Sequence, residues 1–358
     1  MATRYWVGGA GTWSSTNTAN WSASSGGSSG ASVPATTDTV IFDSASGSAN
    51  YTVTFDGTST GCGPLTINGP SSGTLTFDGG NQIFNVAGNL TVAASGLVTF
   101  TFGNFSPIFT NTTPATCTTN GVTISRITID CVGTTLTLGS ALTTQGGVTL
   151  SRGTFDTSST NNWSVTGPNF TRSGSQTSTL NLNSSVITLT GSSTAWSFAT
   201  TTNLTMNASN STITLTTNIA AKTFAGGGLT YGTVNQGGSA ALTISGSNTF
   251  SNIGNTYSAA ATTITFTIST TQTVSNFTAA GSSGKLLTIN SSTAGTVATL
   301  SKSSGIVSSD YLSIRDSTAT PTSLTWYAGA NSTNVSNNSG WIFTAPPAGS
   351  TGNFFLLM

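Results

Sequence analysis

The sequence predicts an all-β protein folded as a β-solenoid, and three observations support this prediction. Apolar residues alternate with single Thr, Ser or Asn residues in short runs, as from Tyr51 to Phe55, which is typical of strands with one buried face. Clusters of Gly, Ser and Asn, such as 226–228, separate the runs and tolerate the positive φ angles of tight turns. Only 4% of the residues are charged and none is Glu, which disfavours helices with a solvent-exposed face.

The spacing of the runs favours a solenoid over a sandwich or barrel. Apolar positions recur every 22 to 25 residues in two series: Leu180, Leu204 and Leu229, and Leu242, Ile264 and Leu287. One coil of two or three short strands has this length. Like charges stacked at a strand spacing of ~4.8 Å would repel one another, whereas Thr, Ser and Asn can form hydrogen bonds along the stack. The scarcity of charge therefore fits parallel stacking.

Residues 1–45 are predicted to form an N-terminal Trp-rich cap. The ends of a solenoid leave unpaired strand edges, which terminal caps must cover. This segment contains three of the seven Trp residues: Trp6, Trp13 and Trp21.

Residues 46–307 are predicted to form the β-solenoid itself. The alternation changes phase between Ile124 and Ile127, which predicts a bulge or corner near Ser125 and Arg126. The three cysteines of the chain fit neither a disulfide framework nor a zinc site, because they are odd in number and widely spaced. We expect buried thiols at Cys62, Cys117 and Cys131.

Residues 308–342 are predicted to form a C-terminal capping module with Trp326, Tyr327 and Trp341. We expect its charged residues to form a network within the cap: Asp310, Arg315 and Asp316. Residues 343–358 are predicted to be a flexible linker with an apolar docking tail: Phe354, Phe355, Leu356, Leu357 and Met358. Exposed apolar residues are unfavourable unless they dock. Docking on the chain's own solenoid and docking on another subunit are both open.

The composition disfavours several classes of function. The chain has no His and no Glu, so Ser-His-Asp and Cys-His triads cannot form from it and a His-built or Cys-built zinc site is not expected. The formal net charge of zero argues against nucleic-acid binding. The chain contains no run of 18 apolar residues, so membrane insertion is not expected. The residues after Arg4 do not form the apolar segment of a secretory signal. We expect no cofactor and no metal.

Paired aspartates are the one catalytic option that remains. Such pairs cleave polysaccharides by acid/base chemistry, and the chain has eight Asp residues: Asp38, Asp43, Asp56, Asp78, Asp130, Asp156, Asp310 and Asp316. Asp56 and Asp78 each precede a Gly, a dipeptide typical of turns, and Asp130 is expected to pair with a basic neighbour along a strand. We therefore predict that the protein is not an enzyme.

Glycan binding without turnover is a further option. Aromatic faces stack on sugars, and the candidates are Trp163, Trp196, Trp326 and Tyr327. The alternative for each residue is a structural place in a cap or corner. Thr-x-Thr steps also recur along the chain, but their irregular spacing disfavours an ice-binding face.

Both ends of the chain resemble one family of proteins. The first segment reads RYWVGGAGTWSSTNTANWS, followed by SGASVPATTDTVIFD. The last reads DYLSIRDSTATPTSLTWYAGANSTNVSNNSGWIF. These segments resemble the opening and closing modules of β-solenoid virion structural or tail-fibre-like proteins of tailed bacteriophages, especially marine ones. The middle of the chain resembles that family only in composition.

The resemblance implies a role and a location. It implies a non-enzymatic structural or appendage protein of a tailed-phage virion, such as a fibre, spike or capsid decoration. Such a protein is assembled in the host cytoplasm and contacts other virion proteins. The resemblance to phage fibres in general also implies a homotrimer, which no residue pattern here indicates. The alternative is a tailspike that binds host-surface glycans as a receptor or depolymerises polysaccharide.

Overall fold

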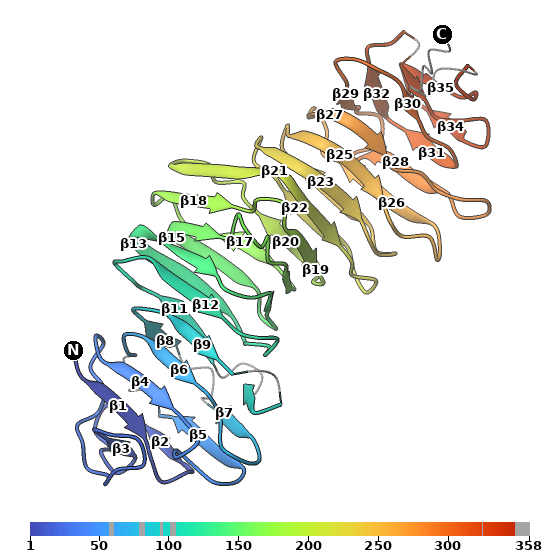
Figure 1. The fold of residues 1–358 in the computed structure, drawn as a ribbon. Coiled ribbons are helices and arrows are strands. Elements are labelled where there is room, and N and C mark those ends of the chain that lie inside the picture. Colours follow the sequence, from blue (N-terminus) through green and yellow to red (C-terminus); the bar gives the residue numbers. More distant parts are fainter. Residues whose placement is uncertain (57–60, 79–82, 94–95, 101–104, 324, 348–358) are drawn as a thin grey trace, which may run out of the picture. The chain divides into compact units, whose positions relative to one another are not determined.

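The computed structural model describes residues 1–56, 61–78, 83–93, 96–100, 105–323 and 325–347. The fold is all-β, a β-solenoid of about 12 turns with parallel stacked strands, which confirms the predicted fold class (Figure 1). The chain divides into two compact units, the first of Met1–Val186 and Thr200–Asn207 and the second of Ile187–Ala199 and Ala208–Met358. No helix in the described ranges is long and apolar enough to span a bilayer.

The first unit contains strands β1 to β18 and the beginning of β21. The early strands are β1 (Thr3–Trp6), β2 (Gly11–Trp13), β3 (Trp21–Ser22), β4 (Thr39–Phe42), β5 (Tyr51–Phe55), β6 (Leu65–Ile67), β7 (Leu75–Asp78), β8 (Ile83–Val86) and β9 (Leu90–Val92). The later strands are β10 (Val98–Phe100), β11 (Ser106–Phe109), β12 (Ala115–Thr118), β13 (Ile127–Leu138), β14 (Leu142–Thr143), β15 (Val148–Asp156), β16 (Val165–Gly167), β17 (Phe170–Arg172) and β18 (Ser178–Asn181).

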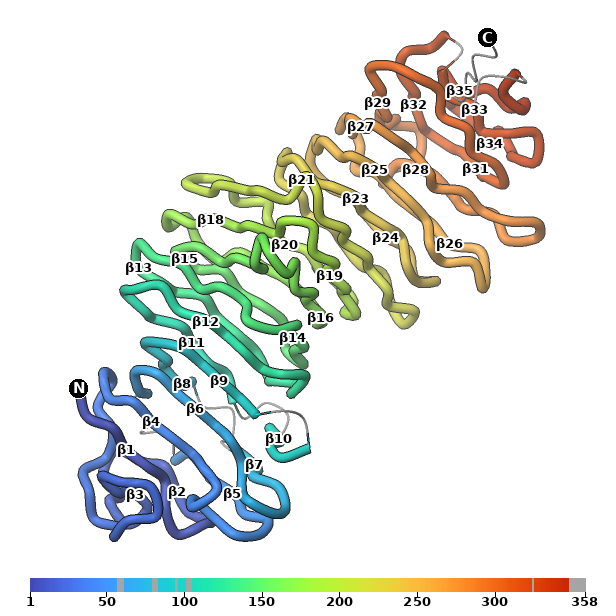
Figure 2. Tube along the Cα trace, viewed as in Figure 1, coloured from blue at the N-terminus to red at the C-terminus, as the bar shows by residue number. Residues whose placement is uncertain are grey.

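Parallel ladders of strands run along the first unit (Figure 2). One ladder contains β1, β4, β6, β9 and β12, the next contains β8, β11, β13, β15 and β17, and a third contains β2, β5, β7 and β10. Identical residues face one another along the stack, as where Leu65 pairs with Leu90 and Thr66 with Thr91. The apolar members of these pairs are buried and the Thr members are partly exposed. The alternation of apolar and Thr residues along each strand therefore places the apolar side chains of successive coils together in the core.

The second unit contains the remaining strands. They are β19 (Val186–Leu189), which begins at the last residue of the first unit, then β20 (Ser193–Ser197), β21 (Leu204–Leu215), β22 (Lys222–Ala225), β23 (Thr230–Gln236), β24 (Leu242–Ser245), β25 (Thr249–Asn255), β26 (Thr262–Phe266) and β27 (Thr271–Thr278). The last are β28 (Leu287–Ser291), β29 (Ala298–Ser301), β30 (Val307–Ser308), β31 (Leu312–Arg315), β32 (Ser317–Thr320), β33 (Trp326–Tyr327), β34 (Thr333–Ser336) and β35 (Trp341–Ile342).

The ladders of the second unit show that the coil length is close to the predicted spacing, although not every predicted pair is in register. Leu242 faces Ile264 as expected, 22 residues along. Ile264 faces Ile289 rather than Leu287. In the first unit, Leu180 faces Met206 rather than Leu204, so both predicted partners are two residues out of register. Turns of different length between coils shift the register, which the apolar spacing alone does not reveal.

The three Trp residues near the N-terminus form one cluster of packed rings. Strand β3 pairs antiparallel with β1, and Trp6 faces Trp21 across that pair. The rings of Trp6 and Trp21 are 5.1 Å apart at 90°, and those of Trp13 and Trp21 are 4.9 Å apart. All three Trp side chains are buried. The antiparallel strand β3 and the indole cluster thus lie at the start of the stack, next to β1, while the cap over residues 1–45 stays a prediction.

The C-terminal coils continue the ladders past residue 308. Strand β31 pairs with β28 and with β34, while β32 pairs with β29. The inward series that contains Ile289 and Ile314 ends at Asn334 in β34. Asn338 donates its Nδ2 to Asn334 Oδ1 and to the Ile314 carbonyl, each at 2.7 Å. The Asn338 side chain therefore satisfies two acceptors next to the point where the apolar series stops.

Two further predictions agree with the structure. A bend lies at Ser125, after a bridge between Ile124 and Thr144 and before β13 begins. The cysteines are free and buried, and burial raises the pKa of the Cys117 and Cys131 thiols to about 12.

Candidate functional site

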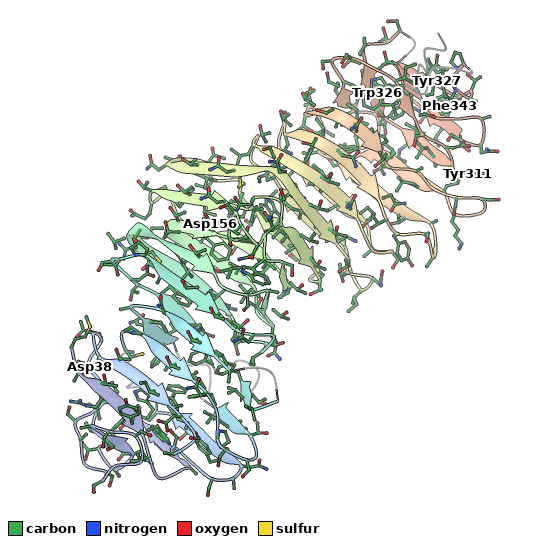
Figure 3. All side chains as sticks on the ribbon, viewed as in Figure 1. Asp38, Asp156, Tyr311, Trp326, Tyr327 and Phe343 are labelled. Carbon is green, nitrogen blue, oxygen red and sulfur yellow. The ribbon has the colours of Figure 1, made fainter. Side chains whose placement is uncertain are left out.

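The aromatic residues at the C-terminal end of the second unit form part of its core (Figure 3). Trp326 is fully buried in β33 and donates its Nε1 proton to the Thr320 carbonyl at 2.8 Å. Its ring lies 5.2 Å from that of Trp341 and 5.8 Å from that of Phe277. Tyr327 is 4% exposed. Neither residue presents an aromatic face on which a sugar could stack.

The other two aromatic candidates also have structural surroundings. Trp196 is fully buried in β20, where its ring stacks on Phe198 and Phe224 and its Nε1 lies 3.3 Å from the Tyr231 hydroxyl. Trp163 is half-buried in the turn between β15 and β16. The structure thus does not bring the four predicted residues together as a glycan platform. Because alternation places a residue inward or outward only once the strand phase is known, sequence alone could not show the burial of Trp196.

A groove of about 420 Å³ lies near the C-terminal end of the second unit, and the predicted cap residue Asp310 lines it. The lining comes from three successive coils and from the segment that follows them. The coils contribute Ala280, then Ser308, Ser309 and Asp310, and then Gly329, Ala330 and Asn331, and the following segment contributes Ala345 and Pro346. Ser309 donates its backbone N–H to the Tyr327 carbonyl at 2.9 Å, so the middle coil is fixed to β33.

The Asp310 carboxylate is held by three N–H donors. Its Oδ1 accepts from the backbone amides of Tyr311 at 2.9 Å and Asn331 at 3.0 Å, and its Oδ2 accepts from Asn331 Nδ2 at 2.7 Å. Burial opposes ionisation, but the hydrogen bonds from Asn331 and Tyr311 outweigh it and keep the pKa of Asp310 below its ordinary value. The carboxylate is therefore ionised at neutral pH and fixed in orientation.

Asp316 forms a separate contact set, so the predicted cap network is two clusters. Its Oδ1 accepts from Asn337 Nδ2 at 2.8 Å, and its Oδ2 lies 3.2 Å from Arg315 Nε. The hydrogen bond from Asn337 is the main cause that lowers the pKa of Asp316. Asp316 is buried, with φ at +54°. It fixes the turn between β31 and β32.

Other aspartates have structural partners. Asp38 accepts the backbone amide of Ala2 at 2.6 Å, a bond that is the largest cause of its lowered pKa. Asp156 accepts from Asn183 Nδ2 at 2.9 Å. Asp130 faces Arg152 across β13 and β15, with Oδ1 and Nε 2.5 Å apart, which confirms the expected pair with a basic neighbour. No group of three or more potential metal-ligating side chains lies in the described segments.

Three buried basic residues were not singled out from the sequence: Arg172, Lys222 and Lys302. Lys222 is 0% exposed and donates its ammonium group to the Ala240 carbonyl at 2.7 Å and the Thr217 carbonyl at 3.2 Å. Burial lowers its pKa from 10.5 to about 8. Arg172 is 7% exposed and donates to carbonyls that include that of Thr200 at 2.6 Å. A signal for Lys222 exists in the sequence, because it lies two residues before the apolar Phe224 and therefore shares its face.

The predicted docking tail lies outside the described residues: Phe354, Phe355, Leu356, Leu357 and Met358. The described chain reaches Pro347, next to the groove-lining Pro346. Docking of the tail stays a prediction.

Comparison of the chain with protein-family models, with curated proteins and with solved structures gives no match. The fold and the contacts above are therefore the basis for assigning a function.

Proposed function

We propose that the protein is a non-enzymatic structural or appendage element of a tailed-phage virion, a fibre, spike or capsid decoration assembled in the host cytoplasm. The observation that supports this proposal is the β-solenoid itself, with clusters of buried Trp side chains near both of its ends. Stacked coils of this kind can serve as a rigid scaffold. The resemblance of the two terminal segments to phage modules is the reason for proposing a virion as the location.

Stacked hydroxyl groups explain how such a scaffold functions with few charges. Thr149 and Thr171 hydroxyls are 3.3 Å apart on neighbouring strands, and Ser151 and Ser173 hydroxyls are 2.8 Å apart. Polar side chains of these two coils thus bond to one another, while the backbone amides pair within the ladder. The low charge limits nonspecific electrostatic adhesion, so attachment depends on the chain's specific contact surfaces.

The contacts of the aspartates favour the non-enzymatic role over polysaccharide cleavage. Asp38, Asp130, Asp156, Asp310 and Asp316 each bond to a backbone amide, an Asn side chain or an Arg side chain. A glycosidase needs one carboxylic acid that keeps its proton and a second carboxylate facing it across the substrate. The lowered pKa values of Asp38, Asp310 and Asp316 are the opposite of what a general acid requires.

Mass spectrometry of gradient-purified particles from a phage that encodes this chain tests the proposal. The copy number is measured against that of the major capsid protein. Hundreds of copies support capsid decoration, and a few to a few dozen support a fibre, spike or neck appendage. Absence of the chain from purified particles would contradict the virion role. Cross-linking within the same particles tests for a homotrimer and identifies the neighbouring virion proteins.

A further inference from the structure

We propose that the groove lined by Asp310, Asn331 and Ser308 binds a neutral sugar residue. This inference rests on the proposed appendage role and specifies what the appendage contacts. It assigns the sugar to a groove between coils rather than to the aromatic residues singled out from the sequence, because Trp196, Trp326 and Tyr327 are buried.

The size and lining of the groove suit one or two sugar rings. Its volume of about 420 Å³ lies within the usual range of small-ligand sites. Small apolar side chains form part of the wall: Ala280, Ala330, Ala345 and Pro346. A pyranose has an apolar C–H face and a polar rim of hydroxyl groups. Methyl groups and a pyrrolidine ring can contact that face without hydrogen-bonding demands of their own.

Three polar groups with unused hydrogen-bonding capacity line the same groove. Asp310 Oδ2 accepts one hydrogen bond, from Asn331 Nδ2, and a carboxylate oxygen can accept a second. Asn331 uses its Nδ2 in that bond, and its Oδ1 accepts no hydrogen bond from the described residues. The Ser308 hydroxyl is on an exposed residue and likewise has no described protein partner. Two acceptors and one hydroxyl that can donate or accept match the vicinal hydroxyl groups of a sugar.

The chain holds these groups in place before any ligand arrives. Gly329 has φ at +84°, and a Cβ atom there would lie 2.4 Å from Asp310 Oδ1 and 2.5 Å from the Ser309 carbonyl oxygen. Only glycine therefore lets the two coils approach closely enough for the Asn331 amide to reach the carboxylate. The Ser309 hydroxyl is fixed in turn by a 2.5 Å hydrogen bond to the Ala279 carbonyl. A preorganised site loses less conformational entropy on binding.

The contacts of Asp310 favour a hydroxyl ligand over a cation. The carboxylate already accepts three N–H bonds, so one direction on Oδ2 is left for a single donor. An ammonium ion could donate to Asp310, Asn331 and Ser308, but it is strongly hydrated, and the alanine and proline side chains of the wall cannot replace its water shell. A sugar hydroxyl supplies one donor, and its neighbouring hydroxyl can reach Asn331 or Ser308.

The test measures binding of methyl glycosides of galactose, glucose, mannose and N-acetylglucosamine to the full chain, by saturation-transfer NMR and titration calorimetry. Methylammonium is titrated in parallel. At least one glycoside is expected to bind. Ser308→Ala should weaken it by about 3- to 10-fold, the loss of one neutral hydrogen bond. Ala330→Trp should abolish it, because Ala330 is exposed and the indole would fill the groove without disturbing the core.

Ala45→Trp is the matched control. Ala45 is an exposed alanine that lines a different depression, in the first unit, and this variant should bind the glycoside as the wild type does. Asp310→Asn is a third variant; if it fails to fold, Ser308→Ala and Ala330→Trp still decide the matter. Binding of methylammonium alone would show an amine site, and binding of no probe, or undiminished binding by Ala330→Trp, would refute the sugar site. Normal incorporation of Ala330→Trp into particles would leave the virion role intact in each case.

Discussion

Replacing Lys222 by Met tests how much stability the buried ammonium group costs the second unit. Lys222 is 0% exposed, and burial lowers its pKa from 10.5 to about 8. Because one pKa unit corresponds to about 1.4 kcal/mol, the charged group costs the folded protein about 3 kcal/mol at pH 7. Met removes that cost and keeps most of the side-chain volume.

The substitution also removes hydrogen bonds, and the structure shows which of them matters. The Ala240 carbonyl keeps a second donor, Gln236 Nε2 at 2.9 Å, whereas the Thr217 carbonyl loses the only donor that the described residues supply. Leaving the Thr217 carbonyl without a donor lowers the free energy of unfolding by about 1 kcal/mol at any pH. At pH 7, Lys222→Met should therefore increase the free energy of unfolding by about 2 kcal/mol.

The effect should change sign as the pH rises. Below pH 8 the ammonium group is charged in both states, so the folded wild type bears the full cost. Between pH 8 and pH 10.5 the folded wild type releases its proton while the unfolded chain keeps it, so the wild type gains stability relative to Lys222→Met. Above pH 10.5 both states are neutral, and the variant should be the less stable by about 1 kcal/mol.

Guanidinium denaturation between pH 7 and pH 11, followed by tryptophan fluorescence, measures this difference. The Trp196 ring stacks 5.6 Å from that of Phe224, so its emission reports on the coils around Lys222. Cys117 and Cys131 ionise more readily in the unfolded chain, which lowers stability at high pH in both proteins, so the readout is the difference between them. A difference that is constant across this pH range would refute the reasoning.

Three further predictions concern the ladders and the chain end. Gly340→Ala should destabilise the last coil by about 1–3 kcal/mol, because Gly340 has φ at +76° and a Cβ atom would collide with the Ala319 carbonyl. Amide hydrogen exchange should become faster in β34 of the variant and stay unchanged in the first unit. The same exchange rate in β34 of the variant and the wild type would contradict this prediction. Asp130→Asn should lower the free energy of unfolding by at most about 1 kcal/mol, since Asp130 and its partner Arg152 are partly exposed. This difference in unfolding free energy between variant and wild type should shrink at 1 M salt. A difference that salt does not change would show that the lost stability is not electrostatic. Deleting 354–358 should leave the melting temperature unchanged and reduce incorporation into phage particles; full incorporation would remove the docking hypothesis.

The sequence by itself determined the fold class. Runs such as Leu75-Thr76-Phe77 bury their first and third residues, because alternation in a strand places every second side chain on one face. The scarcity of charge follows from parallel stacking, and Asp130 facing Arg152 shows that an opposite pair is tolerated where like charges would repel. Local periodicity is sufficient for these conclusions, because a few consecutive residues of one strand already show which side chains share a face.

Only the tertiary structure decided the register and the surroundings of individual side chains. Leu180 faces Met206 because the intervening turns set the coil length, and Asp310 meets Asn331 only because two coils stack at Gly329. The burial of Trp196 likewise depends on neighbouring coils. These contacts join residues 20 or more positions apart, and a side chain's exposure, partners and pKa depend on atoms that the local sequence does not place.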